Sequence, residues 1–158
     1  MTVDLQARAK LAESTRWLVG GRVTNYDFDD SIPTSVDPAI HEIYRHFLWL
    51  LYSDFPEYPL MGKNRLLQAN RDMAARCVVF LKSGMAYPWP VLSRVQSMLL
   101  TVGNLLTLGM AGRVYARGIA AHGDMNHWPF LSQSQYQMAL AAPVYLTGTG
   151  VGHSLQES

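Results

Sequence analysis

Cysteine is almost absent from this chain of 158 residues. Cys77 is the single thiol, so no intramolecular disulfide can form, which is typical of proteins in a reducing compartment. The N-terminal segment also lacks the apolar core of a secretory signal peptide, because Asp4, Arg8 and Lys10 interrupt it. We therefore expect a cytoplasmic protein.

Charge is sparse as well, since 16% of the residues are charged and the net charge is +1. The chain has neither a global positive charge nor a cluster of lysines and arginines to attract a polyanion, so nucleic acid is not an expected partner. Because 49% of the residues are apolar, the chain is expected to fold, and its length suits one domain with one core.

Acidic residues are missing from the middle of the chain, between Asp72 and Asp124. Residues 1–60 contain nine acidic and five basic residues, a balance of −4, whereas residues 61–158 contain three acidic and eight basic residues, a balance of +5. This asymmetry suits an acidic face for a basic partner, a membrane-facing segment or a buried core, and by itself it does not choose among them.

Apolar residues recur mostly at helical spacing, with proline and glycine at the ends of the helical segments. Asp37 followed by Pro38 is a strong helix start, because the carboxylate accepts free N–H groups and proline pre-sets the first helical residue. The sequence predicts helices over residues 4–20, 38–52, 64–82, 92–109, 111–121 and 132–143. It predicts a loop over residues 22–36 and a flexible tail over residues 147–158. The expected fold is all-α, a single-domain bundle of about five to six helices within residues 1–146.

Residues 95–112 form an uncharged run of 18 residues. Arg94 and Arg113 bracket this run, as they would bracket a membrane-spanning helix of about 20 residues. Polar side chains such as Gln96 and Asn104 interrupt its apolar character, however. We expect the run to be the one central apolar helix of the bundle, surrounded by the other helices. A membrane segment and a partner-binding helix are the alternatives.

The sharpest cluster of candidate site residues lies in the predicted loop and comprises Tyr26, Asp27, Phe28, Asp29 and Asp30. The spacing does not fit a calcium-binding loop. Aromatic anchors supply contact area, and carboxylates steer and select a basic partner, so the cluster is a candidate protein-binding surface. In the alternative interpretations, the two rings hold the loop against the core while the acids are solvated, or the cluster is a metal or active site.

The predicted helix over residues 38–52 carries a continuous apolar stripe, and Trp49 points away from it. Trp49 is either covered by another element or exposed as an interface anchor, and we count it among the candidate partner-binding residues. On the same helix, His41 and His46 are five residues apart, which does not match the zinc-protease motif. Glu42 and His46 share a face, which predicts a surface ion pair.

A weaker candidate site comprises His122, Asp124 and His127. Two imidazoles and a carboxylate can hold a metal ion or transfer protons. The alternative is that a loop before a helix simply collects such residues. Cys77 lies on the apolar face of its predicted helix, where a thiol behaves as a small hydrophobic group. No catalytic residue and no cofactor is predicted with these patterns.

Three phrases of the sequence occur together in a known pattern: Trp-Leu-Leu-Tyr-Ser-Asp at 49–54, Phe-Leu-Lys-Ser at 80–83 with Tyr-Pro-Trp-Pro at 87–90, and Gly-Asp at 123–124 with Trp-Pro-Phe at 128–130. Over about residues 15–145 the chain resembles a group of small bacterial proteins that share these phrases. The segment before Tyr87 is more acidic in that group, whereas here it reads Gly-Met-Ala. The resemblance implies no activity for any residue. The small size of the proteins in this group and their lack of a catalytic signature are similar to those of toxin-neutralising immunity proteins.

Taken together, the sequence predicts a non-catalytic protein-binding module, immunity- or adaptor-like. It would meet a protein with a basic surface through residues 26–30 and Trp49. One alternative is a small metal-dependent enzyme that uses His122, Asp124 and His127. A membrane-associated protein, anchored by residues 95–112, is the less expected alternative. A homodimer also stays open, because four tryptophans and eight methionines suit an interface.

Overall fold

The computed structural model describes residues 2–92, 94–107 and 109–141. Within these residues the chain is all-α and forms a single domain, which confirms the predicted fold class. The helices are α1 (Leu5–Val19), α2 (Asn25–Asp30), α3 (Pro38–His46), α4 (Gln68–Ser83), α5 (Arg94–Leu106), α6 (Met110–His122) and α7 (Gln133–Ala141). Short 3₁₀ helices cover Leu48–Leu51, Gly62–Asn64 and Met125–His127.

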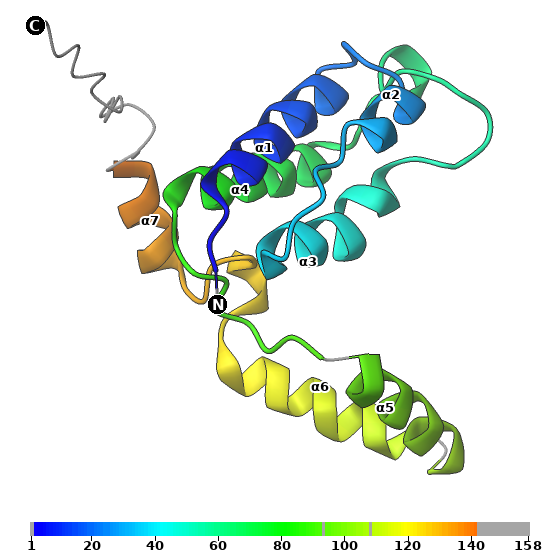
Figure 1. Cartoon of the computed structure of the whole chain (residues 1–158), viewed down its shortest axis with the longest axis vertical. Coiled ribbons are helices and arrows are strands. Elements are labelled where there is room, and N and C mark those ends of the chain that lie inside the picture. The colour runs from blue at the N-terminus through cyan, green and yellow to red at the C-terminus, as the bar shows by residue number, and fades with distance from the viewer. Residues whose placement is uncertain (1, 93, 108, 142–158) are drawn as a thin grey trace, which may run out of the picture.

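Residues 2–92 and 123–141 form the packed part of the molecule, which we call the body. In the body α1 and α4 lie side by side, α2 and α3 pack against α1, and α7 packs against α4 (Figure 1). The core between these helices contains the fully buried side chains Leu11, Leu18, Phe28, Ile40, Ile43, Leu48, Phe80, Leu81 and Phe130. Cys77 is also fully buried there, as its position on the apolar face of the predicted helix indicates.

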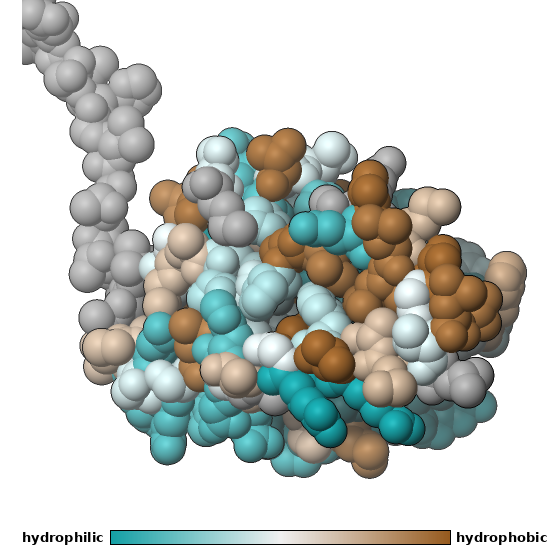
Figure 2. Space-filling view, turned by 90° about the horizontal axis from the view of Figure 1, so that it is seen from below, coloured by the Kyte–Doolittle hydropathy of each residue, from teal (hydrophilic) through white to brown (hydrophobic). Residues whose placement is uncertain are grey.

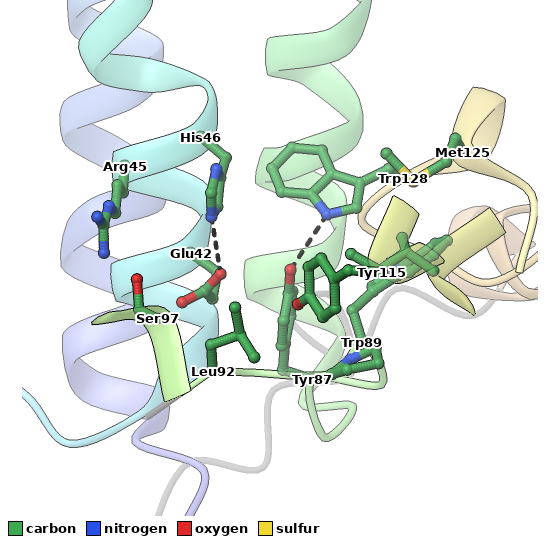
Figure 3. A pocket seen from close by; sticks show the side chains of 12 residues that line it. Glu42, Arg45, His46, Tyr87, Trp89, Leu92, Ser97, Tyr115, Met125 and Trp128 are labelled. Carbon is green, nitrogen blue, oxygen red and sulfur yellow. Dashed lines mark hydrogen bonds and ion pairs between the residues drawn. The ribbon is translucent and has the colours of Figure 1, made fainter. Parts of the chain in front are cut away.

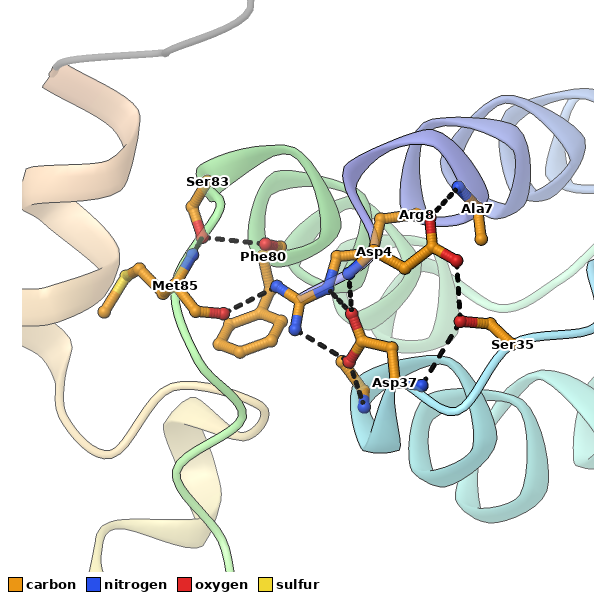
Figure 4. Close-up of polar contacts among 9 residues, drawn as sticks. Asp4, Ala7, Arg8, Ser35, Asp37, Phe80, Ser83 and Met85 are labelled. Atoms are coloured by element: carbon orange, nitrogen blue, oxygen red, sulfur yellow. Dashed lines mark hydrogen bonds and ion pairs between the residues drawn. The ribbon is translucent and has the colours of Figure 1, made fainter. Parts of the chain in front are cut away.

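A buried ion pair joins α1 to the start of α3 (Figure 4). The Nε and Nη2 atoms of Arg8 donate to the two carboxylate oxygens of Asp37 at 2.5 and 2.9 Å, and both side chains are almost completely buried. The third guanidinium nitrogen, Nη1, donates to the carbonyl oxygen of Met85 at 2.6 Å. Arg8 thus ties α1, α3 and the segment after α4 into one unit, and each of its three guanidinium nitrogens has a hydrogen-bond acceptor.

Asp37 has the N-cap role that the sequence predicts, because its carboxylate accepts from the backbone N–H of Ala39 at 2.9 Å. Burial opposes the ionisation of this carboxyl group. Hydrogen bonds from Arg8 and from the backbone N–H groups of Asp4 and Ala39 outweigh that effect and hold the pKa of Asp37 below its usual 3.8. The folded body therefore keeps Asp37 ionised.

The predicted loop over residues 22–36 is partly wrong, because it contains helix α2. Thr24 and Asp27 form a reciprocal capping box at the start of α2: each side chain accepts from the backbone N–H of the other residue, at 3.1 Å. The predicted helix over residues 38–52 ends earlier, at His46, and continues as a 3₁₀ turn. The predicted tail over residues 147–158 lies outside the described residues, as does the end of the predicted last helix.

Helices α5 and α6 form an antiparallel pair, which we call the hairpin, and it projects away from the body (Figure 1). The prediction of one central apolar helix over residues 95–112 is therefore wrong. The run is divided between two helices at Gly109, whose φ of +91° makes the turn, and α5 lies at the edge of the molecule. In the described part of the chain, no helix combines the length and the apolar content that crossing a membrane requires.

Candidate functional site

The predicted acidic and aromatic cluster is divided between the surface and the core. Phe28 is fully buried and contacts the rings of Tyr44 and Tyr52, so the prediction that it touches a partner is wrong. Asp29 accepts hydrogen bonds from the hydroxyl groups of the same two tyrosines, at 2.9 and 2.5 Å. Burial and Asp29 raise the pKa of both phenols. Phe28 and Asp29 therefore hold α2 on the body through their contacts with the two tyrosines.

The remaining members of the cluster are exposed. Tyr26 donates from its hydroxyl group to the carbonyl oxygen of Asp54 at 3.0 Å, and Asp27 takes part in the capping box. Asp30 is exposed at the end of α2. The sequence left open whether another element covers Trp49. It is 47% exposed, so no other part of the described chain covers it fully. Tyr26, Asp27, Asp30 and Trp49 are therefore accessible to a partner.

The candidate metal ligands do not form a metal site. Asp124 accepts from His127 Nδ1 at 2.7 Å and from the backbone N–H of Asn126 at 2.9 Å, so its carboxylate caps a 3₁₀ helix. These hydrogen bonds lower the pKa of Asp124. The ring of His122 contacts the carbonyl oxygen of Pro88 at 2.9 Å instead. Among the residues that the structure describes, no group of three or more His, Cys, Asp or Glu side chains is arranged to hold a metal ion.

One face of α5 is an accessible apolar feature, which we call the α5 stripe. Its residues recur at the a, d and e positions of two successive heptads, a spacing that normally faces a protein core. All six are 45–79% exposed: Val95, Met98, Leu99, Val102, Leu105 and Leu106. In Figure 2, which views the molecule from the end where the hairpin lies, hydrophobic side chains gather on one part of the surface and hydrophilic ones border them.

The contacts between α5 and α6 include polar and small residues on another face of α5. Asn104 Oδ1 accepts from the backbone N–H of Gly112 at 3.0 Å, and a Cβ added at Gly112 would lie 2.8 Å from that oxygen. Gly103 similarly lies close to the side chain of Ala111. The hairpin is thus closed by close backbone approach and a side-chain hydrogen bond, while the side chains of the α5 stripe are exposed.

A pocket of about 220 Å³ lies where the hairpin meets the body (Figure 3). Helix α3 contributes Glu42, and the segment after α4 contributes Tyr87 and Trp89. Helix α6 contributes Tyr115, and Trp128 follows the last 3₁₀ helix. Carboxylate and aromatic side chains from four separate segments therefore converge on one small space, which only the folded chain brings together.

Hydrogen bonds fix the polar atoms of this pocket. Glu42 Oε2 lies 3.0 Å from His46 Nε2, which confirms the predicted ion-pair contact. The indole N–H of Trp128 donates to the Tyr87 hydroxyl oxygen at 3.1 Å, and that of Trp89 donates to the carbonyl oxygen of Pro129 at 2.9 Å. Burial raises the pKa of the Tyr87 hydroxyl group, and the charge of Glu42 adds to the effect. The raised pKa favours the neutral form of the phenol near neutral pH.

Sequence patterns did not identify this pocket. The signals available were tryptophans next to prolines, at Trp89 and Trp128, which marked a resemblance but no geometry. Tyr115 lies in a predicted helix without any motif that indicates a site. For Glu42 the sequence predicted only an ion pair with His46. Comparisons of the chain with family models, with curated proteins and with solved structures find no match. The resemblance to a group of small bacterial proteins therefore stays a prediction.

Proposed function

We propose that this chain is a non-catalytic protein-binding module that works as a self-associated pair. In this pair the α5 stripe of one copy packs against the α5 stripe of a second copy. The bodies, with their exposed acidic surfaces, are then free to meet a basic protein. The observation that carries the proposal is the outward orientation of the whole stripe, whose six apolar side chains are 45–79% exposed.

The spacing of the stripe suits another helix. Residues at a, d and e positions form the face with which a helix packs into the grooves of a neighbouring helix. In the hairpin that face is largely exposed, and Asn104 on another side of α5 makes the contact with α6. A second α5 in antiparallel orientation would bring the two stripes together, with their apolar side chains between the two α5 helices.

The size of the stripe is also that of an interface. Exposed apolar patches on monomeric proteins reach about 300–600 Å², and a standard interface buries about 800 Å² per partner. Six large apolar side chains at these exposures lie together on one face of α5, and Met110 and Val114 of α6 are also 64% and 65% exposed. Burying such a surface is the main favourable term in protein association.

A second copy of the chain fits the charge pattern. The stripe contains no ionisable group, so two identical stripes meet without like-charge repulsion, and a twofold axis requires only that the surface complement itself. A lipid surface fits less well. Interfacial helices usually have lysine or arginine on the polar face and Trp or Phe on the apolar one, whereas the polar face of α5 carries the uncharged Ser97, Thr101 and Asn104.

Pairing through the hairpin leaves the acidic side of the body accessible. Helix α2 lies at the end of the molecule far from α5 and α6 (Figure 1). Around it, Asp27, Asp30, Asp54 and Glu57 are exposed, and Trp49 provides a partly exposed apolar ring. Carboxylates around an aromatic anchor favour a protein partner with a basic surface, through steering and selectivity.

The proposal is tested by measuring molar mass with light scattering after size-exclusion chromatography. We expect the wild type at twice the 17.7 kDa of one chain. Leu99→Glu places two carboxylates in the paired stripes and should weaken association by about a hundredfold or more. Val36→Glu, on an 83% exposed side chain of the body, is the matched control and should remain dimeric.

A wild type that stays monomeric at high concentration would overturn self-association, as would a Leu99→Glu variant that still dimerises. Flotation of the wild type with vesicles of neutral and anionic lipid, in the absence of a dimer, would assign the stripe to a membrane surface instead. Circular dichroism establishes that both variants are folded, which is expected because both side chains point into solvent.

The basic partner is tested with residues that do not hold the fold. Asp29 and Phe28 are unsuitable because they anchor α2, and Asp27 also caps it. Asp30→Asn combined with Trp49→Ala removes one exposed charge and one exposed ring. A basic protein recovered from the host is purified and titrated against both forms, and we expect weaker binding with a smaller salt dependence for the variant. Equal affinity and equal salt dependence would contradict this assignment.

A further inference from the structure

We propose that the pocket between the body and the hairpin binds a small organic cation, an ammonium or guanidinium group held between Glu42 and the surrounding aromatic rings. This proposal is independent of self-association. The pocket lies on the α6 side of the hairpin, because α5 contributes Ser97 from its polar face and no member of the stripe. A paired hairpin would therefore leave the pocket open.

The walls of the pocket are aromatic on several sides. Tyr87 and Trp89 come from the segment between α4 and α5, Tyr115 comes from α6, and Trp128 comes from the segment before α7 (Figure 3). Trp89 and Trp128 use their N–H groups to bind Pro129 and Tyr87. Both indoles line the pocket, and their N–H groups are already engaged in these hydrogen bonds. Ring surfaces are electron-rich and attract cations, tryptophan most strongly.

Glu42 supplies the negative charge. Its side chain is 18% exposed, and His46 holds one carboxylate oxygen at 3.0 Å. Burial raises the pKa of Tyr87 and of Tyr115, and the charge of Glu42 adds to both shifts, so its field reaches the phenols on two other walls. A cation that enters the pocket would lose its hydration water and gain contacts with one carboxylate and several aromatic rings. Aromatic rings around a cation are the arrangement that recognises alkylated ammonium groups.

Two basic residues of α3 also border the pocket, and their positions decide whether the space between Glu42 and the rings is open to a ligand cation. His46 contacts Glu42, and Arg45 lies on the opposite side of Glu42 from the aromatic rings (Figure 3). The rings therefore do not already surround a cation of the chain. A ligand cation would enter between Glu42 and the rings, where the local charge is that of the carboxylate.

The volume limits the ligand to a small group. Pockets for drug-sized molecules measure about 300–1,000 Å³, and this one measures about 220 Å³. It suits a tetramethylammonium-sized head group or the end of one lysine or arginine side chain. The cation could belong to a free amine or to a side chain of a basic protein, and both have this chemistry. The small-molecule probes in the experiment below distinguish the two sources.

The test is a titration of the full chain with tetramethylammonium chloride, followed by tryptophan fluorescence and by the indole N–H signals in two-dimensional NMR. Sodium chloride at matched ionic strength is the reference. We expect a saturable change in the signals of Trp89 and Trp128 and none in those of Trp17 and Trp49. Glu42→Gln should weaken binding by about tenfold or more, and Tyr115→Leu by about fivefold.

Glu13→Gln is the matched control, because Glu13 also forms an exposed ion pair but lies on α1, outside the pocket. It should bind as the wild type does. Titration with the methylamide of N-acetyl-lysine and with guanidinium then separates a side chain from a free quaternary amine. A response no larger than that of sodium chloride would overturn the proposal, as would equal affinity for Glu42→Gln. Saturation by acetate instead would assign the pocket to an anion.

Discussion

Helices α1 and α5 have similar lengths and similar numbers of apolar residues, yet they differ in what covers them. In α1, Leu11 and Leu18 are completely buried against the rest of the body. In α5, Leu99 and Leu105 occupy equally regular positions but are 65% and 79% exposed. Helical spacing therefore fixes which side of a helix is apolar, but not which surface covers that side. An exposed apolar side of this kind is typical of a contact surface, which is the basis of our proposal of self-association.

Polar contacts differ between the two regions in the same way. The body buries a charged pair, Arg8 with Asp37, at its centre and satisfies both groups. The hairpin places the neutral Asn104 between its helices, where the side-chain oxygen binds the backbone of α6. Burying charge requires complete hydrogen bonding, which only a well-packed body provides. The body thus satisfies its buried polar groups internally, whereas we propose that a second copy covers the apolar face of the hairpin.

The largest effect is expected from breaking the buried ion pair in the body. Arg8→Met leaves the Asp37 carboxylate buried without its cation, and we expect the free energy of unfolding to fall by about 3–5 kcal/mol. Arg16→Met removes an exposed ion pair from the same helix and should change it by less than about 1 kcal/mol. Urea unfolding of both variants provides the comparison. Equal effects would contradict the role of Arg8 as the centre of the body.

The second-largest effect is expected from a leucine-to-alanine substitution in the core of the body, compared with the same substitution in the α5 stripe. Leu11→Ala opens a cavity in the core and should destabilise the chain by about 2–5 kcal/mol. Leu105→Ala removes an exposed side chain and should change the unfolding free energy of a dilute, monomeric sample by less than about 0.5 kcal/mol. At high concentration, where stripes are paired, the Leu105→Ala effect should grow. A concentration-independent effect would argue against pairing.

A smaller effect depends on pH. The folded chain holds the pKa of Asp37 below 3.8, so the stabilisation is present above that pH and is lost as the pH falls through the folded pKa. Asp37→Asn lacks this contribution at every pH. We therefore expect the stability difference between wild type and Asp37→Asn, measured by urea unfolding, to be largest near neutral pH and to shrink below about pH 4. A constant difference would show that Asp37 acts through packing alone.

The local signals in the sequence predicted most of the body correctly. Asp37 before Pro38 marks the start of α3, and Asp4 caps α1 by accepting from the N–H of Ala7. The start of α2 was missed because its capping box uses Asp27 in place of the usual Glu or Gln. The burial of Arg8 had no local signal, since its partner lies 29 residues away in the sequence. Pairing over such distances is decided by packing.

The candidate site was less predictable for the same reason. Exposed acids and Trp49 were identified from residue type, but the burial of Phe28 depends on Tyr44 and Tyr52 of another segment. The run over residues 95–112 was correctly seen as apolar and wrongly placed at the centre, because the turn at Gly109 makes it a hairpin. The pocket requires four segments to meet at the root of that hairpin, and no single stretch of sequence contains it.

The most direct test of the central claim, that the α5 stripe is a contact surface, is amide hydrogen exchange at two protein concentrations about a hundredfold apart. Exchange in α1 and α4 should be slow and independent of concentration, because their own chain covers them. Exchange in α5 should be fast in the dilute sample and clearly slower in the concentrated one. Fast exchange in α5 at both concentrations would contradict the account, because the stripe would then remain uncovered where a second copy is abundant.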